Sequence, residues 1–342
     1  MTRPVLGVTM GDAAGVGPEI IARAGAEPAV RASCRPVVIG AVAPMREALA
    51  LIDSPLALHT VSRVADCRWG DGTLEVLDLA NVDMATVPRG EVSAAAGRAA
   101  YEYIERSVSL ATSGEIDAIV TAPVNKEALA AAGVPHSGHT EILAELSHTR
   151  DFAMLLMGKE LKVIHVTTHV ALRRVPDLVT RERVLKTIRL AQRTLESLGQ
   201  PHGRIAVAGL NPYAGEDGLF GDEEKTAIGP AIEEARRAGL DVHGPLPADT
   251  LFSRARGGEF DIVVAMYHDQ GHVPVKTLGF NYDEKTGTWT GLSGVNVTVG
   301  LPFLRVSVDH GTAFDRAWKG IANPESMLEA LDVAVRMLTS RA

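Results

Sequence analysis

Short apolar runs alternate with amphipathic helical stretches along most of the chain, and this alternation restricts the fold more than any other feature. Near-continuous apolar runs of strand length are typical of strands that are covered on both faces. Strands that alternate with helices build largely parallel sheets, so the pattern predicts an α/β fold. The predicted strands are Val5–Thr9, Pro36–Gly40, Thr73–Leu77, Ala118–Ala122, Phe152–Met157, Leu161–Thr167, Ile205–Leu210, Asp261–Ala265 and Val295–Val299. The predicted helices are Pro18–Gly25, Ser93–Ser113, Arg181–Leu198, Glu223–Ala238 and Glu325–Leu338.

A chain of 342 residues is long enough for two domains. Because no Pro/Ser-rich linker separates two halves, we expect the chain to cross between the domains more than once. The predicted first domain comprises residues 1–125 with 305–342, and the second comprises residues 126–304. The least regular segment, 283–293, is expected to form an exposed hairpin or loop.

The formal net charge of −8 argues against general attraction to nucleic acid or to an anionic membrane. An anionic substrate would therefore have to be held by local basic residues. The two cysteines, Cys34 and Cys67, form no CxxC pattern, which is compatible with a reducing compartment. The N-terminal apolar run is too short for a signal peptide or a membrane span, so we expect a cytoplasmic protein.

A glycine-rich segment, Gly11-Asp12-Ala13-Ala14-Gly15-Val16-Gly17-Pro18-Glu19, follows the first predicted strand. Its glycines allow a tight turn and close approach to a ligand, and Pro18 suits the first turn of a helix. Such a junction can face an anion or a cofactor through Gly11 and Asp12. The segment matches neither the GxGxxG fingerprint nor a Walker loop, so a plain tight turn is the alternative.

Two further polar segments fall at strand or helix ends. Thr121–Lys126 ends a predicted buried strand, where polar groups commonly line a site. The alternative is that Asn125 caps a helix. In Gly138–Glu141, Thr140 is placed to cap the next helix. His139 would then sit beside a helix start, where it could donate a hydrogen bond to a carboxylate or phosphate.

His169 and His268 each lie just past a strongly apolar predicted strand. Imidazoles at adjacent strand ends can converge on one divalent metal ion. Asp269 could orient His268 or bind the metal itself. The wide spacing of the histidines excludes a local motif such as HExxH.

Basic and amide side chains suited to an anion also occur in the C-terminal part of the chain, namely Lys276, Asn296 and Arg305. Arg305 follows an apolar run, so it either snorkels from the edge of the core or grips a phosphate or carboxylate. In the segment 309–313, Asp309 and His310 either belong to a helix start or contact a cofactor. Nucleophilic catalysis has little support because GxSxG is absent and neither cysteine has a reactive local context.

Eight segments resemble the family of 4-hydroxythreonine-4-phosphate dehydrogenase, which includes dehydrogenases of 4-phosphorylated threonate or erythronate. These segments are MGDAAGVGPEI (10–20), TAPVNKEAL (121–129), SGHTEIL (137–143), VTTHVALR (166–173), AGLNPYAGEDGLFGDEE (208–224), GPLPADTLF (244–252), AMYHDQGHVPVK (265–276) and GVNVTVGLPFLRVSVDHGTA (294–313). They cover essentially the whole chain in the same order. MYHDQG and SVDHGTA are the most specific of them.

The resemblance implies a two-domain fold like that of isocitrate and isopropylmalate dehydrogenases, with the active site in the interdomain cleft. It also implies a homodimer with a shared active site and a divalent metal, Zn, Mg, Co or Mn, held by three histidines. Two of these histidines correspond to His169 and His268, and the third position falls on Tyr213. A phenol with a reference pKa of ~10 is a poor ligand at neutral pH, so we expect weaker metal binding, or replacement of the ligand by Asp269, Tyr213 or water.

The resemblance further implies that the substrate contacts are His139, Thr140, Lys276, Asn296 and Arg305. The expected cofactor is NAD, with Gly11, Asp12, Asn211, Asp309 and His310 as candidate contacts, and Lys276 and Asp269 are the expected catalytic residues. Ala13 stands where relatives usually carry proline, and the longer loop 281–293 bears on the choice of substrate.

The implied reaction is NAD-dependent oxidation of a small phosphorylated 3-hydroxy acid at its CH–OH group, followed by loss of CO₂. It would serve either pyridoxine biosynthesis or sugar-acid breakdown. Two alternatives remain, a dehydrogenase of a non-phosphorylated cis-diol carboxylate and a non-catalytic ligand-binding homologue. A metal-dependent lyase without redox chemistry is a further alternative.

Overall fold

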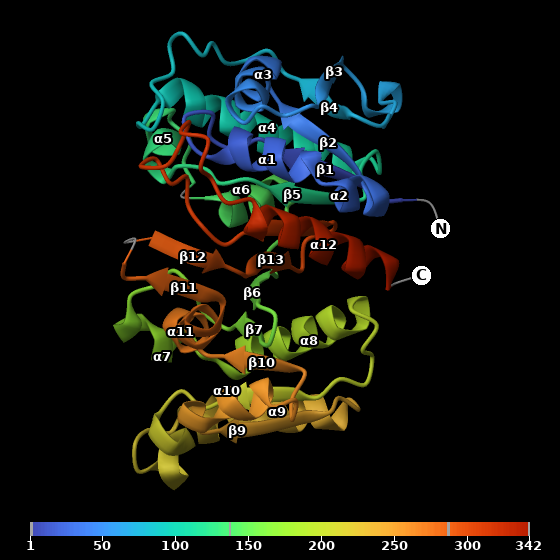
Figure 1. Cartoon of the computed structure of the whole chain (residues 1–342). Coiled ribbons are helices and arrows are strands. Elements are labelled where there is room, and N and C mark those ends of the chain that lie inside the picture. The colour runs from blue at the N-terminus through green and yellow to red at the C-terminus, as the bar shows by residue number, and fades with distance from the viewer. Residues whose placement is uncertain (1–2, 137, 286–287, 341–342) are drawn as a thin grey trace. The chain divides into compact units, whose positions relative to one another are not determined.

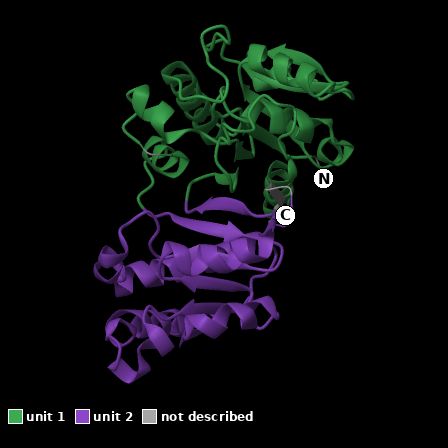
Figure 2. Cartoon of the chain, turned by 60° about the vertical axis from the view of Figure 1, so that its left-hand side comes forward, with its two compact units in different colours: residues 1–150, 301–338 green, residues 151–300, 339–342 purple. Residues whose placement is uncertain are grey.

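The computed structural model describes residues 3–136, 138–285 and 288–340. The chain divides into two compact units: unit 1 contains residues 1–150 and 301–338, and unit 2 contains residues 151–300 and 339–342 (Figure 2). The chain thus leaves unit 1 after residue 150, returns to it at residue 301, and ends with a few residues that are assigned to unit 2. The divisions fall near residues 150 and 300, whereas the sequence placed them near 125 and 305. Residues 126–150 belong to unit 1 because helices α5 (Lys126–Ala131) and α6 (His139–Leu146) pack against α4 (Ala94–Thr112).

The sheet of unit 1 has the strand order β3-β4-β2-β1-β5-β14, and all of its neighbouring strands are parallel. The strands are β1 (Val5–Thr9), β2 (Arg35–Gly40), β3 (Ala57–Val61), β4 (Thr73–Asp78), β5 (Ala118–Thr121) and β14 (Leu304–Val308). The other helices are α1 (Gly17–Ala26), α2 (Pro28–Ser33), α3 (Val42–Leu51) and α12 (Glu325–Thr339) (Figure 1). Strand β5 is buried along its whole length, as predicted for a strand covered on both faces.

The sheet of unit 2 has the strand order β13-β6-β7-β10-β8-β9. Strands β7, β10, β8 and β9 are parallel, whereas β6 is antiparallel to both of its neighbours. The strands are β6 (Ala153–Met157), β7 (Lys162–His165), β8 (Ile205–Ala208), β9 (Val242–Leu246), β10 (Ile262–Ala265) and β13 (Val295–Val299). The helices are α7 (Val175–Leu178), α8 (Arg181–Ser197), α9 (Gly229–Arg237), α10 (Ala248–Arg256) and α11 (His268–Gly279).

The α/β class and the largely parallel sheets predicted from the sequence are confirmed. All predicted strands are present, and the segment 283–293 lies mostly in a hairpin of β11 (Phe280–Asp283) and β12 (Thr288–Leu292). Two positions of that segment, 286 and 287, lie outside the described residues. The prediction missed β3, β9, β14 and several short helices, because brief elements carry little periodicity. It also missed α3 and the longer α11, which contains Pro274 in its interior. The predicted helix Glu223–Ala238 is a π-helical turn, Glu224–Ile228, followed by α9.

Local chemistry explains several helix boundaries. Ser93 caps α4 by accepting the N–H of Ala96, and Gly114 follows the end of α4 with a positive φ of 76°. Gly97 lets α5 approach α4 closely, since a Cβ there would overlap the carbonyl oxygen of Ala128. This close approach fixes the segment that leads from β5 towards α6.

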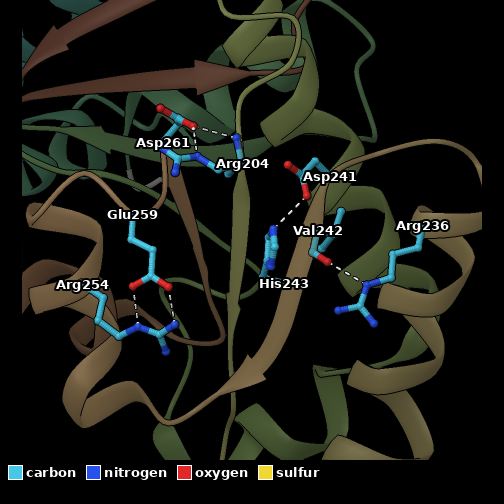
Figure 3. Close-up of polar contacts among 8 residues, drawn as sticks. All are labelled: Arg204, Arg236, Asp241, Val242, His243, Arg254, Glu259 and Asp261. Carbon is cyan, nitrogen blue, oxygen red and sulfur yellow. Dashed lines mark hydrogen bonds and ion pairs between the residues drawn. The ribbon is translucent and has the colours of Figure 1, made fainter.

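The amino ends of the parallel strands of unit 2 are fastened by polar contacts (Figure 3). Asp261, before β10, accepts hydrogen bonds from the backbone N–H and Nε of Arg204, which precedes β8. Asp241, before β9, contacts His243 at 2.8 Å. Because parallel strands place all their amino ends at one edge, these contacts lie at the edge opposite the carboxyl ends of the same strands. The described helices include none that is long and apolar enough to cross a membrane.

Candidate active site

Arg305 is a buried cation in unit 1. It is the second residue of β14 and is 3% exposed, and its Nη2 donates a hydrogen bond to Oγ1 of Thr121 at the end of β5 (2.7 Å). Burial lowers the pKa of Arg305 to about 9, and the nearby carboxylate of Glu141 acts in the opposite direction. A buried guanidinium that stays charged at neutral pH is a strong potential anchor for an anion.

His139 and Thr140 lie near this cation, at the start of α6. The helix begins at His139 with Gly138 as its N-cap residue, so the predicted capping role of Thr140 is wrong. Burial, together with the charge of Arg305, holds the pKa of His139 well below its ordinary value. Its Nε2 is buried and has no hydrogen-bond partner among the described residues. Unit 1 thus holds a neutral imidazole beside a buried cation.

The glycine-rich loop after β1 is tied to neighbouring strand ends of unit 1. The N–H of Asp12 donates to the carbonyl of Pro123, and a Cβ at Gly11, whose φ is 72°, would overlap that carbonyl oxygen. Asp12 Oδ1 accepts the N–H of Ala14 at 2.8 Å, and burial raises the pKa of Asp12 to about 6. Gly11 therefore allows close approach to a neighbouring part of the chain's own backbone, whereas the predicted approach to a ligand stays a prediction.

The same loop meets the segment that contains Asp309 and His310. The N–H of Val16 donates to the carbonyl of Thr312 at 3.0 Å, so the structure brings two predicted cofactor segments together. His310 contacts the carbonyl of Gly311 through Nδ1, and burial lowers the pKa of His310. Asn125 accepts the N–H of Ala128 and caps α5, which confirms the capping alternative for that residue.

His169 and His268 lie together in unit 2, as the sequence predicted. Their ring centroids are 5.8 Å apart, and both rings line a pocket of about 370 Å³. The other lining residues are Thr168, Val170, Leu172, Val175, Tyr267 and Asp269. Asp269 Oδ1 accepts a hydrogen bond from His268 Nδ1 at 2.7 Å, and this bond lowers the pKa of Asp269. Asp269 therefore orients His268, which is one of its predicted roles.

The histidine pair can be compared with the geometry of a shared metal ion. Two imidazoles on one ion, with metal–nitrogen bonds of ~2.0–2.1 Å, bring their ring centres to ~5–6 Å. The pair His169–His268 fits this distance. Within the described part of the chain, however, no group of three or more His, Cys, Asp or Glu side chains is arranged to hold a metal ion. The pair is thus compatible with part of a ligand set.

Tyr213 lies in a turn of unusual backbone conformation. Residues 213–217 all have positive φ, between 40° and 82°. Tyr213 is 61% exposed. Tyr213 is not one of the described residues that line the pocket of His169 and His268. Asn211 precedes this turn, and its side-chain amide donates to Glu223 and Glu224. The Asn211 amide therefore helps to hold the loop.

Lys276 and Asn296 also belong to unit 2. Lys276 is in the last turn of α11, with Nζ 5.2 Å from the ring centroid of Phe280. Asn296 is on β13, and its Oδ1 is buried without a hydrogen-bond partner in the described part of the chain.

Two histidines of this region, His165 and His272, were missed by the sequence analysis. The ring of His165 lies 4.9 Å from that of His272, which stacks on His268 at 3.7 Å. The i, i+4 spacing of His268 and His272 on one helix was the available signal, because such residues share a helix face.

The fold and these residues define a two-unit, mostly parallel α/β protein with ionisable groups gathered at strand and helix ends. The chain belongs to the family described as pyridoxal phosphate biosynthetic protein PdxA, which matches residues 32–334. This confirms the family resemblance drawn from the sequence motifs.

Individual relatives match nearly the full length. The chain is 50% identical over 340 residues to the D-threonate 4-phosphate dehydrogenase of Cupriavidus necator, covering 99% of this chain and 98% of that protein. It is 46% identical to a 4-hydroxythreonine-4-phosphate dehydrogenase from Klebsiella pneumoniae of known crystal structure (TM-score 0.86, 98% of each chain covered). A terephthalate 1,2-cis-dihydrodiol dehydrogenase from Burkholderia xenovorans is 29% identical (TM-score 0.68, 98% of each chain covered).

Proposed function

We propose that this protein is a dehydrogenase that oxidises the CH–OH group of a small 4-phosphorylated 3-hydroxy acid of the D-threonate 4-phosphate or 4-hydroxythreonine 4-phosphate type. The buried cation Arg305, beside the neutral imidazole of His139, is the observation that carries the proposal. A protein with a net charge of −8 needs such a local anchor to hold a phosphorylated acid. Relatives that match nearly the whole chain carry names of this substrate class.

The proposed substrate contacts are Arg305, His139 and Thr140 in unit 1, and Lys276 and Asn296 in unit 2. Arg305 would bind an anionic oxygen of the substrate through its planar fork, while Thr121 holds one arm of that fork in place. His139, held neutral, would exchange a hydrogen bond with the substrate without adding charge. Lys276 is the proposed acceptor of the hydroxyl proton; it takes this role as the neutral amine and carries positive charge beside the substrate once the proton has been transferred.

The proposed cofactor is NAD, which would take the hydride from the substrate carbon. In unit 1, Gly11, Asp12, Asp309 and His310 are its proposed contacts, supported by the hydrogen bond from Val16 to Thr312 that joins their two segments. Asn211 of unit 2 is also a proposed contact. Its side-chain amide nitrogen already donates to Glu223 and Glu224, so other atoms of Asn211 would contact the cofactor. Loss of CO₂ from the resulting 3-keto acid is part of the proposal.

A divalent metal ion is a further part of the proposal, with His169 and His268 as its ligands from this chain. When bound, it would supply positive charge that lowers the pKa of the substrate hydroxyl. Tyr213, which is exposed, and water are candidates for the remaining positions. Asp269 holds His268 with its proton on Nδ1, which leaves the lone pair on Nε2.

A homodimer is also proposed. Several large apolar residues of unit 2 are exposed in the single chain, among them Leu172 (68%), Leu219 (72%) and Val273 (61%). A contiguous exposed apolar patch is typical of protein–protein contacts, and we propose that these side chains contact the second subunit. Light scattering should give twice the chain mass of 36.2 kDa, and a single-chain mass would contradict the proposal. The cytoplasmic location stays a prediction.

The test is NADH formation, followed at 340 nm, with D-threonate 4-phosphate, 4-hydroxythreonine 4-phosphate, erythronate 4-phosphate and their dephosphorylated forms. We expect turnover only with phosphorylated acids, and loss of turnover after chelation with recovery on adding Co²⁺ or Zn²⁺. Failure to turn over any phosphorylated 3-hydroxy acid would refute the dehydrogenase proposal. Full activity in metal-free protein would remove the metal from it.

A second candidate is a dehydrogenase of a non-phosphorylated cis-diol carboxylate, favoured by the 29% identity to the Burkholderia xenovorans enzyme. A terephthalate cis-dihydrodiol offered in the same assay separates the two candidates. Turnover of that diol, with none of the phosphorylated acids, would establish the second one.

A further inference from the structure

The imidazoles of His268 and His272 form a parallel stack on α11. Their ring centroids are 3.7 Å apart and their planes differ by 8°. His272 is anchored to its own helix, because its Nδ1 donates to the carbonyl oxygen of His268 at 3.0 Å. A carbonyl can only accept, so this bond fixes the proton of His272 on Nδ1. His272 is 6% exposed, so its ring has little room to move.

His165 supports the stack from the core. It ends β7, is fully buried, and its Nδ1 donates to the carbonyl oxygen of Met154 at 3.1 Å. Its ring lies 4.9 Å from the ring of His272. Gly271 leaves space for it, since a Cβ at position 271 would overlap Nε2 of His165. His272 is therefore held between a rigid interior ring and His268.

His268 is held in two ways. Asp269 holds the edge of the His268 ring through the hydrogen bond to Nδ1. The Asp269 side chain is itself 77% exposed, so its surroundings restrict its movement only weakly. His272 fixes the face of the ring and is itself buried. A single hydrogen bond to an exposed carboxylate permits the ring to swing about that bond, whereas a buried stacked ring opposes the swing.

We propose that His272 is a positioning residue, which holds the His268 imidazole in the single orientation that presents its Nε2 lone pair to a cation shared with His169. This inference rests on the proposed function, in which His268 is a metal ligand. A metal ligand must keep a fixed orientation, and we attribute the fixed orientation of His268 to His272, a side chain outside the pocket. The ring face of His272 carries the effect, so an aromatic replacement should preserve it.

Three variants test this role, His272→Leu, His272→Phe and the control His202→Leu, which removes an exposed histidine of unit 2. Calorimetric titration of metal-free protein with Co²⁺ gives the dissociation constant. We expect it to rise about tenfold or more in His272→Leu, and to stay within about threefold of wild type in His272→Phe and within about twofold in His202→Leu. Circular dichroism melting identifies any variant that does not fold.

A second readout does not require metal. Nitrogen-15 correlation spectra of the histidine rings report the tautomer of His268, whose signals are identified by their loss in His268→Asn. Wild type and His272→Phe should show one sharp set of His268 signals with the proton on Nδ1, and His272→Leu should show exchange-broadened or averaged signals.

Equal Co²⁺ affinity and identical His268 signals in folded His272→Leu would overturn the proposal. So would an equally large loss in folded His272→Phe, because the stack would then not be the cause. If wild type neither binds Co²⁺ nor forms NADH, the proposed function fails. The ring spectra would then still decide whether His272 orients His268.

Discussion

Arg305 Nη2 donates a hydrogen bond to Oγ1 of Thr121 at 2.7 Å, although 184 residues separate them along the chain. The two residues come from adjacent parallel strands of unit 1, β5 and β14. A guanidinium in this position costs desolvation free energy, which is why its pKa falls to about 9. A buried charge with such a cost is retained most readily where it binds a ligand.

Replacing Arg305 should weaken substrate binding without lowering the thermal stability of the protein. In Arg305→Met, an apolar chain of similar length replaces the buried cation, so we expect a midpoint of thermal unfolding no lower than that of wild type. Loss of a charge-assisted contact worth ~1.5–3 kcal/mol should raise KM for the phosphorylated acid by about 10- to 150-fold. Steady-state kinetics and calorimetry measure both effects, with the exposed Arg193→Met as control. An unchanged KM would exclude Arg305 from the site.

Asp12 should make stability depend on pH. Burial raises its pKa in the folded protein to about 6, above the ordinary value of 3.8. Between these pH values the folded state binds more protons than the unfolded state, so its contribution to the free energy of unfolding falls as pH rises from about 4 to 6. The slope from one group is at most ~1.4 kcal/mol per pH unit.

The variant Asp12→Asn keeps an oxygen for the N–H of Ala14 and removes the charge. Urea unfolding at pH 4 to 8 should therefore show a smaller fall in stability than wild type across pH 4–6. The exposed Asp71→Asn is the control. Parallel pH curves for wild type and Asp12→Asn would contradict the prediction.

Gly271 should not tolerate a side chain. A Cβ there would overlap His165 Nε2 and lie 2.7 Å from Val163 Cγ1, both in the packed interior. Overpacking of this kind costs ~1–3 kcal/mol, so Gly271→Ala should lower the free energy of unfolding by that amount. Gly257→Ala, where the nearest atom is at 3.4 Å, should change it little. Equal stability of the two variants would show that the core around His165 can relax.

The left-handed turn at residues 213–217 should be relieved by glycine. Ala214 has a φ of 53°, a conformation that costs an L-residue roughly 1–2 kcal/mol and costs glycine almost nothing. We therefore expect Ala214→Gly to raise the free energy of unfolding by up to about 1 kcal/mol, after the entropy cost of glycine. The matched change Ala130→Gly, on the exposed side of α5, should lower it by ~0.5–1 kcal/mol. Chemical denaturation gives both values, and a loss of stability in Ala214→Gly would show that the methyl group packs.

Tyr213→His should strengthen metal binding if Tyr213 faces the proposed ion. A neutral imidazole binds divalent metals without the deprotonation that a phenol requires, and histidine also tolerates the positive φ of 52°. We expect the dissociation constant for Co²⁺ to fall by about tenfold or more. The exposed Tyr282→His is the control. No change in Tyr213→His would place that side chain away from the ion.

The sequence by itself determined the α/β class, the long strands and helices, and the family. Buried strands such as β5 appear as continuous apolar runs, and the cap at Asn125 follows from a local hydrogen bond to Ala128. Histidines just past two such strands could be paired because neighbouring parallel strands end at one edge of a sheet, and the 5.8 Å between His169 and His268 agrees with that.

Only the tertiary structure decided which side chains support the site. Arg305 was described from the sequence only as following an apolar run, whereas it lies within β14 and is paired with Thr121. The stack of His272 on His268, the tilted contact of His165 with His272, and the left-handed turn at Tyr213 were not predicted. The physical reason is that periodicity records which face of an element is buried, whereas ring contacts and strained backbone depend on neighbours far away in the chain.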